Sequence, residues 1–312
     1  MTRLIIVIST ILAAFHLDAV SCAGYSDFGA SYIWFNVPEA NAIVRGIGGD
    51  VNTLSPRGGI DTDDCGWGVM AALGFQWGGC SMGELRGFYS QNDEGSESST
   101  VLSSNVLLFY DITGNGNAYT ATADHGVSSL DLRIYGGDAL FICDCFCSDC
   151  NQFSWAAGLS YKRLEQNHEF YGSFDGSKVT NFYVKDELST DYIGLAMGVR
   201  GEVFFTSCMA FFFAGDLDFY YANDCLASEQ MVNASTEFSA DIDNNDFAIY
   251  GEGKIGMMFI NGCFTLGVHG FYGGFSYAPQ VVYPLSAEGA AVHLDCDTLT
   301  RYGAELTVGL RF

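Results

Sequence analysis

Basic residues are scarce in this chain of 312 residues, which has 13 lysines and arginines against 37 acidic residues. The net charge of −24 excludes nucleic acid as a natural partner, because phosphate binding needs clustered lysine and arginine side chains. Long apolar runs are also scarce. Beyond the N-terminus, no stretch has the ~20 consecutive apolar residues that a membrane-spanning helix needs, so a membrane protein with this sequence must cross the bilayer with strands.

The chain begins with a segment typical of a secretory signal peptide. A single early charge, Arg3, precedes the apolar run 4–15, and small residues follow at 21–23. We therefore expect cleavage after Ala23, with residues 1–23 as the signal and 24–312 as the mature domain. The apolar run is too short to favour a membrane anchor. A lipoprotein cleavage site ending at the cysteine of this segment is an alternative, although the usual leucine three residues before it is missing.

The last stretch of the chain, 301–312, has the two-residue period of a β-strand. One face, from Tyr302 to Phe312, is apolar and aromatic. The other, from Gly303 to Arg311, carries glycine, threonine and both signs of charge. A strand with lipid outside and a polar lumen inside alternates in this way. The segment therefore predicts the closing strand of a membrane barrel.

This terminal strand resembles that of Gram-negative outer-membrane β-barrel proteins, whose last strand typically ends in an aromatic residue that the barrel-assembly machinery recognises. The resemblance implies an assembly signal at Tyr302, Leu310 and Phe312, with outer-membrane lipid and that machinery as partners. A second segment, Tyr192 to Arg200 followed by an aromatic strand, is similar to the Legionella-type pore-forming outer-membrane protein family, which also carries cysteines.

Nine further segments alternate in the same way, and the connections between them are long and short in turn. The predicted strands are 27–37, 66–77, 82–91, 127–135, 152–166, 191–205, 208–221, 247–260 and 263–277. Four long polar stretches are predicted to be outer loops: 38–64, 167–190, 222–246 and 279–299. Asn261 and Gly262 predict a tight hairpin turn. The fold class is therefore all-β, an antiparallel transmembrane β-barrel of about 10 to 12 strands with long outer loops and short periplasmic turns.

Two alternatives stay open at this point. Within 92–126, the apolar segment 101–112 forms either an extra hairpin, which raises the strand count to twelve, or a loop folded into the lumen as a plug. A secreted β-sandwich also alternates and is also rich in glycine, of which the chain has 38. Its strands are usually shorter, about 5 to 6 residues.

Charged residues on the strands are predicted to face the lumen, because an arginine or lysine facing lipid near the midplane costs about 2 to 4 kcal/mol. The predicted lumen-lining residues are Glu84, Arg86, Asp131, Arg133, Lys162, Arg200, Glu202, Asp216, Asp218, Glu252, Lys254, His269, Glu305 and Arg311. The two signs of charge are nearly balanced in this set. In a barrel of about eight to ten strands they form a packed polar core, whereas in a wider barrel they line a narrow channel that favours cations.

Ten of the 11 cysteines remain once Cys22 is removed with the predicted signal. The disulfide candidates are Cys65, Cys80, Cys143, Cys145, Cys147, Cys150, Cys208, Cys225, Cys263 and Cys296. An even number in an exported chain indicates disulfides. The predicted topology places an odd number on each side of the membrane. Local disulfides within one long turn are one interpretation, and disulfide-linked neighbours or a homo-oligomer are the other.

No cofactor, metal site or catalytic centre is predicted. The four thiols within 143–150 are too closely spaced for the paired arrangement of zinc sites. Asp241, Asp243, Asn245 and Glu252 have the offsets of a calcium loop by coincidence, since an aspartate occupies the glycine position. Diffuse binding of divalent cations to the acidic loops is the weaker expectation. No histidine stands in a recognisable relation to a serine or carboxylate, so the chain is predicted not to be an enzyme.

These features predict an outer-membrane β-barrel that is exported by a cleaved signal peptide. The first functional hypothesis is a porin-like channel for passive diffusion of small solutes or cations, and the polar inward faces motivate it. The second is a structural or surface-adhesive barrel with a sealed lumen, with disulfide cross-links in the envelope as a further option. The balanced inward charges and the cysteine-rich turns motivate this second hypothesis.

Overall fold

The computed structural model describes residues 24–36, 44–46, 53–54, 63–76, 81–92, 97–101, 106–122, 125–147, 151–173, 182–232, 236–284 and 291–312. The predicted signal peptide lies outside the described residues. Within these ranges the chain forms no helix of the length and hydropathy needed to cross a membrane.

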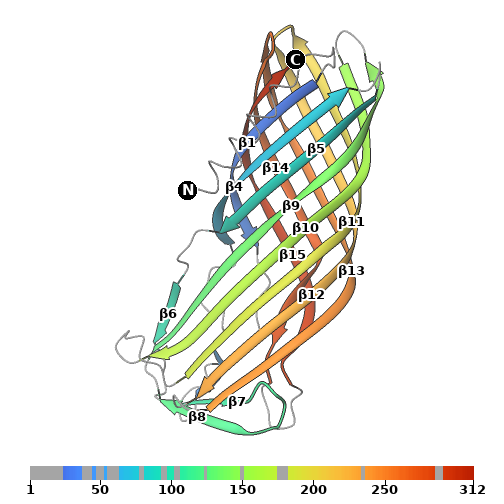
Figure 1. Ribbon diagram of the computed structural model, residues 1–312. Coiled ribbons are helices and arrows are strands. Elements are labelled where there is room, and N and C mark those ends of the chain that lie inside the picture. Colours follow the sequence, from blue (N-terminus) through green and yellow to red (C-terminus); the bar gives the residue numbers. More distant parts are fainter. Residues whose placement is uncertain are drawn as a thin grey trace.

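Ten antiparallel strands form a closed ring, which confirms the predicted all-β barrel (Figure 1). In chain order these strands are β1 (Gly24–Asn36), β4 (Asp63–Gln76), β5 (Ser81–Asn92), β9 (His125–Cys147), β10 (Asn151–Ser173), β11 (Phe182–Thr206), β12 (Met209–Val232), β13 (Thr236–Asn261), β14 (Phe264–Val282) and β15 (His293–Arg311). The first and last strands pair with each other, with Tyr25 opposite Arg311 and Asn36 opposite Thr300. Short connections join the strands at one end, called here the turn end, and the opposite end is called the extended end. At the turn between β13 and β14, Gly262 has a φ of 61°, as the Asn-Gly dipeptide predicts.

An apolar belt surrounds the ring near the turn end. Outward side chains there are large and hydrophobic, and Leu159, Ile193 and Ile255 are 66%, 60% and 62% exposed. Aromatic side chains mark the belt's limit toward the extended end: Tyr161, Tyr221, Phe247 and Tyr272. So large an exposed apolar surface is unfavourable in water and favourable in contact with lipid. Aromatic side chains are typical of the interface between lipid and water.

The strands from β9 to β13 continue well past this belt (Figure 1). They contain 23 to 26 residues each, and most of the predicted loops 167–190, 222–246 and 279–299 are therefore strand, so those loop predictions were wrong. The alternation inverts beyond the belt, because the outside is then water rather than lipid. Val184 and Leu226 are fully buried inside while Glu187 and Glu229 are exposed.

The same inversion overturns one part of the predicted lumen. Asp131 and Arg133 lie on the outer face, where they pair with each other at 2.5 Å between carboxylate and guanidinium. Leu130, Leu132 and Ile134, which were predicted to face outward, are buried in the interior, at most 4% exposed. This part of β9 lies beyond the belt, so its apolar face turns inward.

Five further strands lie at the extended end. They are β2 (Val44–Gly46), β3 (Thr53–Leu54), β6 (Glu97–Val101), β7 (Val106–Tyr110) and β8 (Ala118–Thr122). Strand β6 pairs with the start of β9, and the other four form a small separate sheet in the order β3-β2-β7-β8. The segment 101–112 contributes β7 to a hairpin, β7–β8, which belongs to this small sheet at the extended end and not to the ring, so the alternative of twelve barrel strands is wrong (Figure 1).

The hairpin of β14 and β15 bends away from its neighbour β13. The pairing of β13 with β14 runs from Asn261 opposite Phe264 to Tyr250 opposite Phe275, and the register of β14 with β15 then shifts between Phe275 and Ala278. Past that irregularity, the backbone carbonyls of Tyr277 and Pro279 accept hydrogen bonds from inward side chains of β11 and β10. The outer part of β14 therefore crosses toward the lumen.

Candidate functional site

A cavity of about 370 Å³ occupies the lumen at the turn end. Arg200 holds Glu84 through two hydrogen bonds of 2.6 and 2.7 Å, and the Tyr25 hydroxyl donates to the same carboxylate. Closer to the end of the barrel, Arg311 pairs with Glu202 at 3.2 Å. The cavity is thus lined by paired charges rather than by a single sign.

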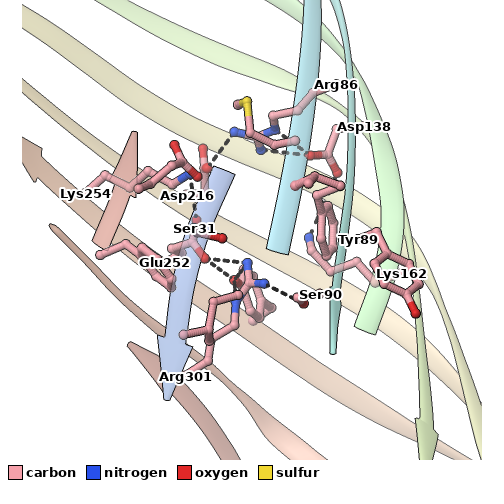
Figure 2. Close-up of a pocket in the computed structure, with 17 residues that line it drawn as sticks. Ser31, Arg86, Tyr89, Ser90, Asp138, Lys162, Asp216, Glu252, Lys254 and Arg301 are labelled. Atoms are coloured by element: carbon pink, nitrogen blue, oxygen red, sulfur yellow. Dashed lines mark hydrogen bonds and ion pairs between the residues drawn. The ribbon is translucent and has the colours of Figure 1, made fainter. Parts of the chain in front are cut away.

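The next level of the lumen is a network of buried ion pairs around a void of about 50 Å³ (Figure 2). Arg86 joins Asp138 at 2.8 Å to Asp216 at 3.0 Å, and so links β5 to β12 across the interior. Arg301 donates to Glu252 at 2.6 Å. These charges neutralise one another and leave little free space.

Two lysines complete this network. Lys162 contacts Asp218 and the Tyr220 hydroxyl, and its side chain is only 3% exposed. Lys254 lies 3.3 Å from Glu305 and 3.5 Å from Glu252. A buried charge costs several kcal/mol unless it is paired, so these partners are what permit charges at this depth.

An aromatic layer follows the ion pairs. Tyr192 of β11 stacks on Phe275 of β14 with ring centroids 4.6 Å apart, and Tyr250 of β13 lies 4.7 Å from the same ring. Tyr220 adds an edge contact to Tyr192 at 5.8 Å. Aliphatic side chains from other strands, including Leu132, pack in the same fully buried cluster. The rings come from the neighbouring strands β11 to β14, and the rest of the cluster adds buried side chains from β1, β9, β10 and β15 on the other sides of the lumen.

Buried polar groups lie beyond the aromatic layer and outside the lipid belt. The Tyr277 hydroxyl donates to Asp224, and burial raises the pKa of both groups. Asp186 accepts from Ser228 at 2.6 Å and from Tyr283, and lies 3.4 Å from the Nδ1 atom of His168. These bonds join β10, β11, β12 and the end of β14 in one place.

An apolar cluster closes the extended end. Its fully buried members include Phe182, Val184 and Leu226, and the turn after β7 contributes Ile112, which is 1% exposed. The backbone of Ile112 is held on both sides: its N–H donates to the Gln230 side chain at 3.2 Å, and its carbonyl accepts from Val292 at 2.9 Å. The turn thus acts as a cap over the lumen.

The predicted lumen-lining residues fall into two groups. The structure places twelve of them inside the barrel: Glu84, Arg86, Lys162, Arg200, Glu202, Asp216, Asp218, Glu252, Lys254, His269, Glu305 and Arg311. Asp131 and Arg133 lie outside, as described above. The His269 ring packs against Phe212 and its Nε2 lies 3.0 Å from the Thr307 hydroxyl.

Several interior residues were missed by the sequence-based prediction. Arg301 shares the parity of Glu305 and Arg311, so the alternation of the last strand was sufficient to place it inside. Asp138 lies in a stretch with no predicted strand, and His168 and Asp186 lie in a predicted loop. For His168 and Asp186, polar character was mistaken for solvent exposure, whereas Asp138 received no prediction.

The cysteines show no bond to one another among the residues the structure covers. Cys143, Cys145, Cys208, Cys225, Cys263 and Cys296 carry free thiols, and Cys65 lies half-buried in β4. Cys80 and Cys150 lie outside the described residues, as does the side chain of Cys147. The predicted disulfides therefore stay a prediction.

The described ranges contain no group of three histidine, cysteine or acidic side chains that could hold a metal ion. The residues with calcium-loop offsets lie on the straight strand β13, with Asp241 and Asp243 exposed and Glu252 buried against Arg301.

No family model and no curated protein sequence matches the chain, so the resemblance to the Legionella-type family stays a prediction. Solved structures do match. The outer membrane protease OmpT from Escherichia coli is 9% identical, with a TM-score of 0.50 over 95% of this chain and 99% of that chain. The chain has the fold of an outer-membrane β-barrel. Ail, the attachment invasion locus protein of Yersinia pestis, is 9% identical with a TM-score of 0.29, covering 93% of this chain and 99% of that chain. A Pseudomonas aeruginosa FadL homologue is 8% identical with a TM-score of 0.32, covering 93% and 90%.

Proposed function

We propose that this protein is an outer-membrane β-barrel with a sealed lumen, which carries a rigid surface structure above the membrane. This is the second of the two functions that the sequence suggests. The observation that carries it is the aromatic layer of Tyr192, Tyr250 and Phe275, which lies between the ion-pair network and the cap. Passive diffusion would require a continuous polar path past these fully buried rings.

Bonds between distant strands support the same proposal at several levels. Arg86 to Asp216 joins β5 to β12, and Gln166 to the Pro279 carbonyl joins β10 to β14. Tyr283, the residue after β14, donates to Asp186 of β11. In a barrel of about ten strands the interior is just wide enough for side chains to fill it. The cavity at the turn end then ends at the ion-pair network and does not continue as a pore.

The outer half of the barrel supports a surface role. Strands β10 to β13 extend past the lipid belt with polar side chains outward and apolar side chains inward, which is how a water-exposed sheet packs. With the turn end in the periplasm, this half stands outside the cell, with outer-membrane lipid around the belt. The barrel-assembly machinery is the expected partner in assembly.

Conductance in a planar bilayer tests this proposal. The refolded mature chain is expected to insert without discrete openings, and a pore-forming barrel added to the same membrane verifies that ion flow is detected. Proteolysis of the accessible parts in vesicles checks that the silent protein is inserted. Discrete cation-selective openings of the wild-type protein would reject the sealed lumen and favour the porin-like channel instead.

A further inference from the structure

One border of the surface structure is an unpaired strand edge. Strand β13 pairs with β12 along its whole length, as far as Thr236 opposite Val232. On its other side, the pairing with β14 stops at Tyr250. Among the described residues, no strand covers this side of β13 from Thr236 to Ile249. Within the described part of the chain this edge lacks a neighbouring strand because the outer part of β14 bends into the lumen.

Two hydrogen bonds show which backbone groups face this edge. The N–H of Ile249 donates to the Ser276 hydroxyl at 2.9 Å, and the N–H of Phe247 donates to the carboxylate of Asp246 at 2.7 Å. Because alternate residues of a strand direct their N–H groups to the same side, the N–H groups of Asn245 and Asp243 also face the open edge. No acceptor for these two N–H groups is present in the described part of the chain.

Exposure agrees with an open edge at this position. From 243 to 247 every side chain is exposed, on both faces of the strand, whereas Ala240 and Ile242 nearer the tip pack against the apolar cluster. The edge from Glu237 to Phe247 has a length of about 35 Å at the usual rise of a strand. That length accommodates an added strand of about ten residues.

The acidic side chains along the edge favour a basic partner strand. Glu237, Asp241 and Asp243 point outward along it, and Asp246 lies on the opposite face. A second copy pairing antiparallel through the same edge would bring acidic side chains into register with each other, and like charges directly opposite are destabilising. A strand with lysine or arginine at alternate positions would place opposite charges there instead.

We propose that the edge of β13 from Glu237 to Phe247 is a docking site for an extended, basic segment of another protein, which adds to the sheet as one more strand. The proposal deepens the surface role put forward above and rests on it. Backbone hydrogen bonds to the free N–H and carbonyl groups supply the affinity, and the carboxylates of Asp241 and Asp243 supply the selectivity for a basic partner.

Binding of a synthetic peptide to the refolded mature chain in phosphatidylcholine vesicles tests the docking site. The probe is a ten-residue peptide of alternating lysine and threonine, and an alternating glutamate and threonine peptide is its control. The first peptide is expected to bind and the second is not. Absence of binding by the lysine peptide would overturn the proposal.

Matched variants separate the edge from the general negative charge. Asp241→Lys with Asp243→Lys is expected to weaken binding about tenfold or more. Glu169→Lys with Glu187→Lys makes the same change of charge on exposed residues of β10 and β11, and is expected to change binding by less than about twofold. Equal losses in the two double variants would mean diffuse attraction and would overturn the docking site.

The backbone contribution has its own test. Asn245→Pro removes an edge N–H without removing a bond to β12, and is expected to weaken binding about tenfold, whereas Asn245→Ala leaves it unchanged. If the proline variant misfolds, a lysine and threonine peptide methylated at alternate backbone nitrogens replaces it. Tight binding of that methylated peptide to the wild-type chain would overturn strand addition.

Conductance measured on the same preparation keeps the two proposals distinct. A silent barrel that does not bind the lysine peptide retains the sealed lumen and loses the docking site. A conducting barrel that binds the peptide with the expected dependence on Asp241 and Asp243 loses the sealed lumen and retains the docking site.

Discussion

Replacing Arg301 with methionine tests whether water reaches the ion pairs inside the lumen, because the change in the free energy of unfolding depends on the hydration of Glu252. The Arg301 guanidinium donates to Glu252 at 2.6 Å and to the Tyr250 hydroxyl at 2.8 Å. The side chains of Arg301 and Glu252 are 12% and 6% exposed. The variant Arg301→Met keeps most of the side-chain volume and leaves the Glu252 carboxylate, among the described residues, paired with Lys254 alone, at 3.5 Å.

The expected loss in the free energy of unfolding follows from this geometry. Breaking a buried ion pair by removing one partner costs about 3 to 5 kcal/mol, because a charge is left without compensation in a medium of low polarity. Lys254 compensates Glu252 in part, so we expect about 3 kcal/mol, the lower end of that range. Adding Glu252→Leu removes the stranded charge, and the double variant is expected to be more stable than Arg301→Met alone.

Arg163 provides a matched control on the outer face of the barrel. It pairs with Glu165 at 3.0 Å and Asp191 at 3.2 Å, but its side chain is 31% exposed. Since water screens such a pair, Arg163→Met is expected to cost less than about 1 kcal/mol. Urea unfolding in lipid vesicles, followed by tryptophan fluorescence, measures both variants. Equal costs below about 1 kcal/mol would mean that water hydrates Glu252, and the argument for a sealed lumen would fail.

Three further predictions concern other parts of the barrel. Ile112→Ala removes a fully buried side chain from the cap and is expected to destabilise its docking by about 2 to 4 kcal/mol, so limited proteolysis should cleave the β7–β8 turn faster than in the wild type. The pKa of Asp224 is raised by burial, so its favourable contribution is complete below its ordinary value of 3.8 and is lost as the pH rises through the raised value. Asp224→Asn should therefore be more stable than the wild type at pH 7 and equally stable at low pH, as urea midpoints at both values would show. Cys208 and Cys263 are exposed at the turn end, and if they link neighbouring molecules, non-reducing electrophoresis of envelopes should show multimers that Cys208→Ser with Cys263→Ser abolishes. Monomer alone in the wild type would refute cross-linking.

Part of each of the ten ring strands could be predicted from the sequence, and for nine of them the reason is that lipid outside and charge inside produce a strong alternation. The last strand is an example, with Leu306, Val308 and Leu310 outward and Glu305 inward. For β9 the prediction found only the part beyond the belt and missed the part from 136 onward. The same rule failed beyond the belt. There the outer solvent changes from lipid to water, and Leu132 and Asp131 exchange faces although their alternation is unchanged.

The sequence could predict which residues face the interior of the barrel, but not which of them contact one another. Alternation places Arg86 and Asp216 on inward faces, yet nothing in the sequence shows that strands separated by 130 residues bring them to 3.0 Å. That contact depends on the ring closing at ten strands, since strand number sets the diameter. The aromatic layer was missed for a related reason. Tyr192 and Phe275 have apolar neighbours, and only the bend of β14 decides that their rings meet.

Pairing of the first strand with the last has a consequence for biosynthesis. Gly24 and Phe312 exchange two backbone hydrogen bonds, of 2.7 and 2.9 Å, next to a register that runs from Tyr25 opposite Arg311 to Asn36 opposite Thr300, so the ring closes only once β15 has been made. A chain that stops short presents two bare strand edges, and lipid offers no partner for their N–H and carbonyl groups. Stable insertion of this barrel in lipid therefore requires that β15 be present to pair with β1.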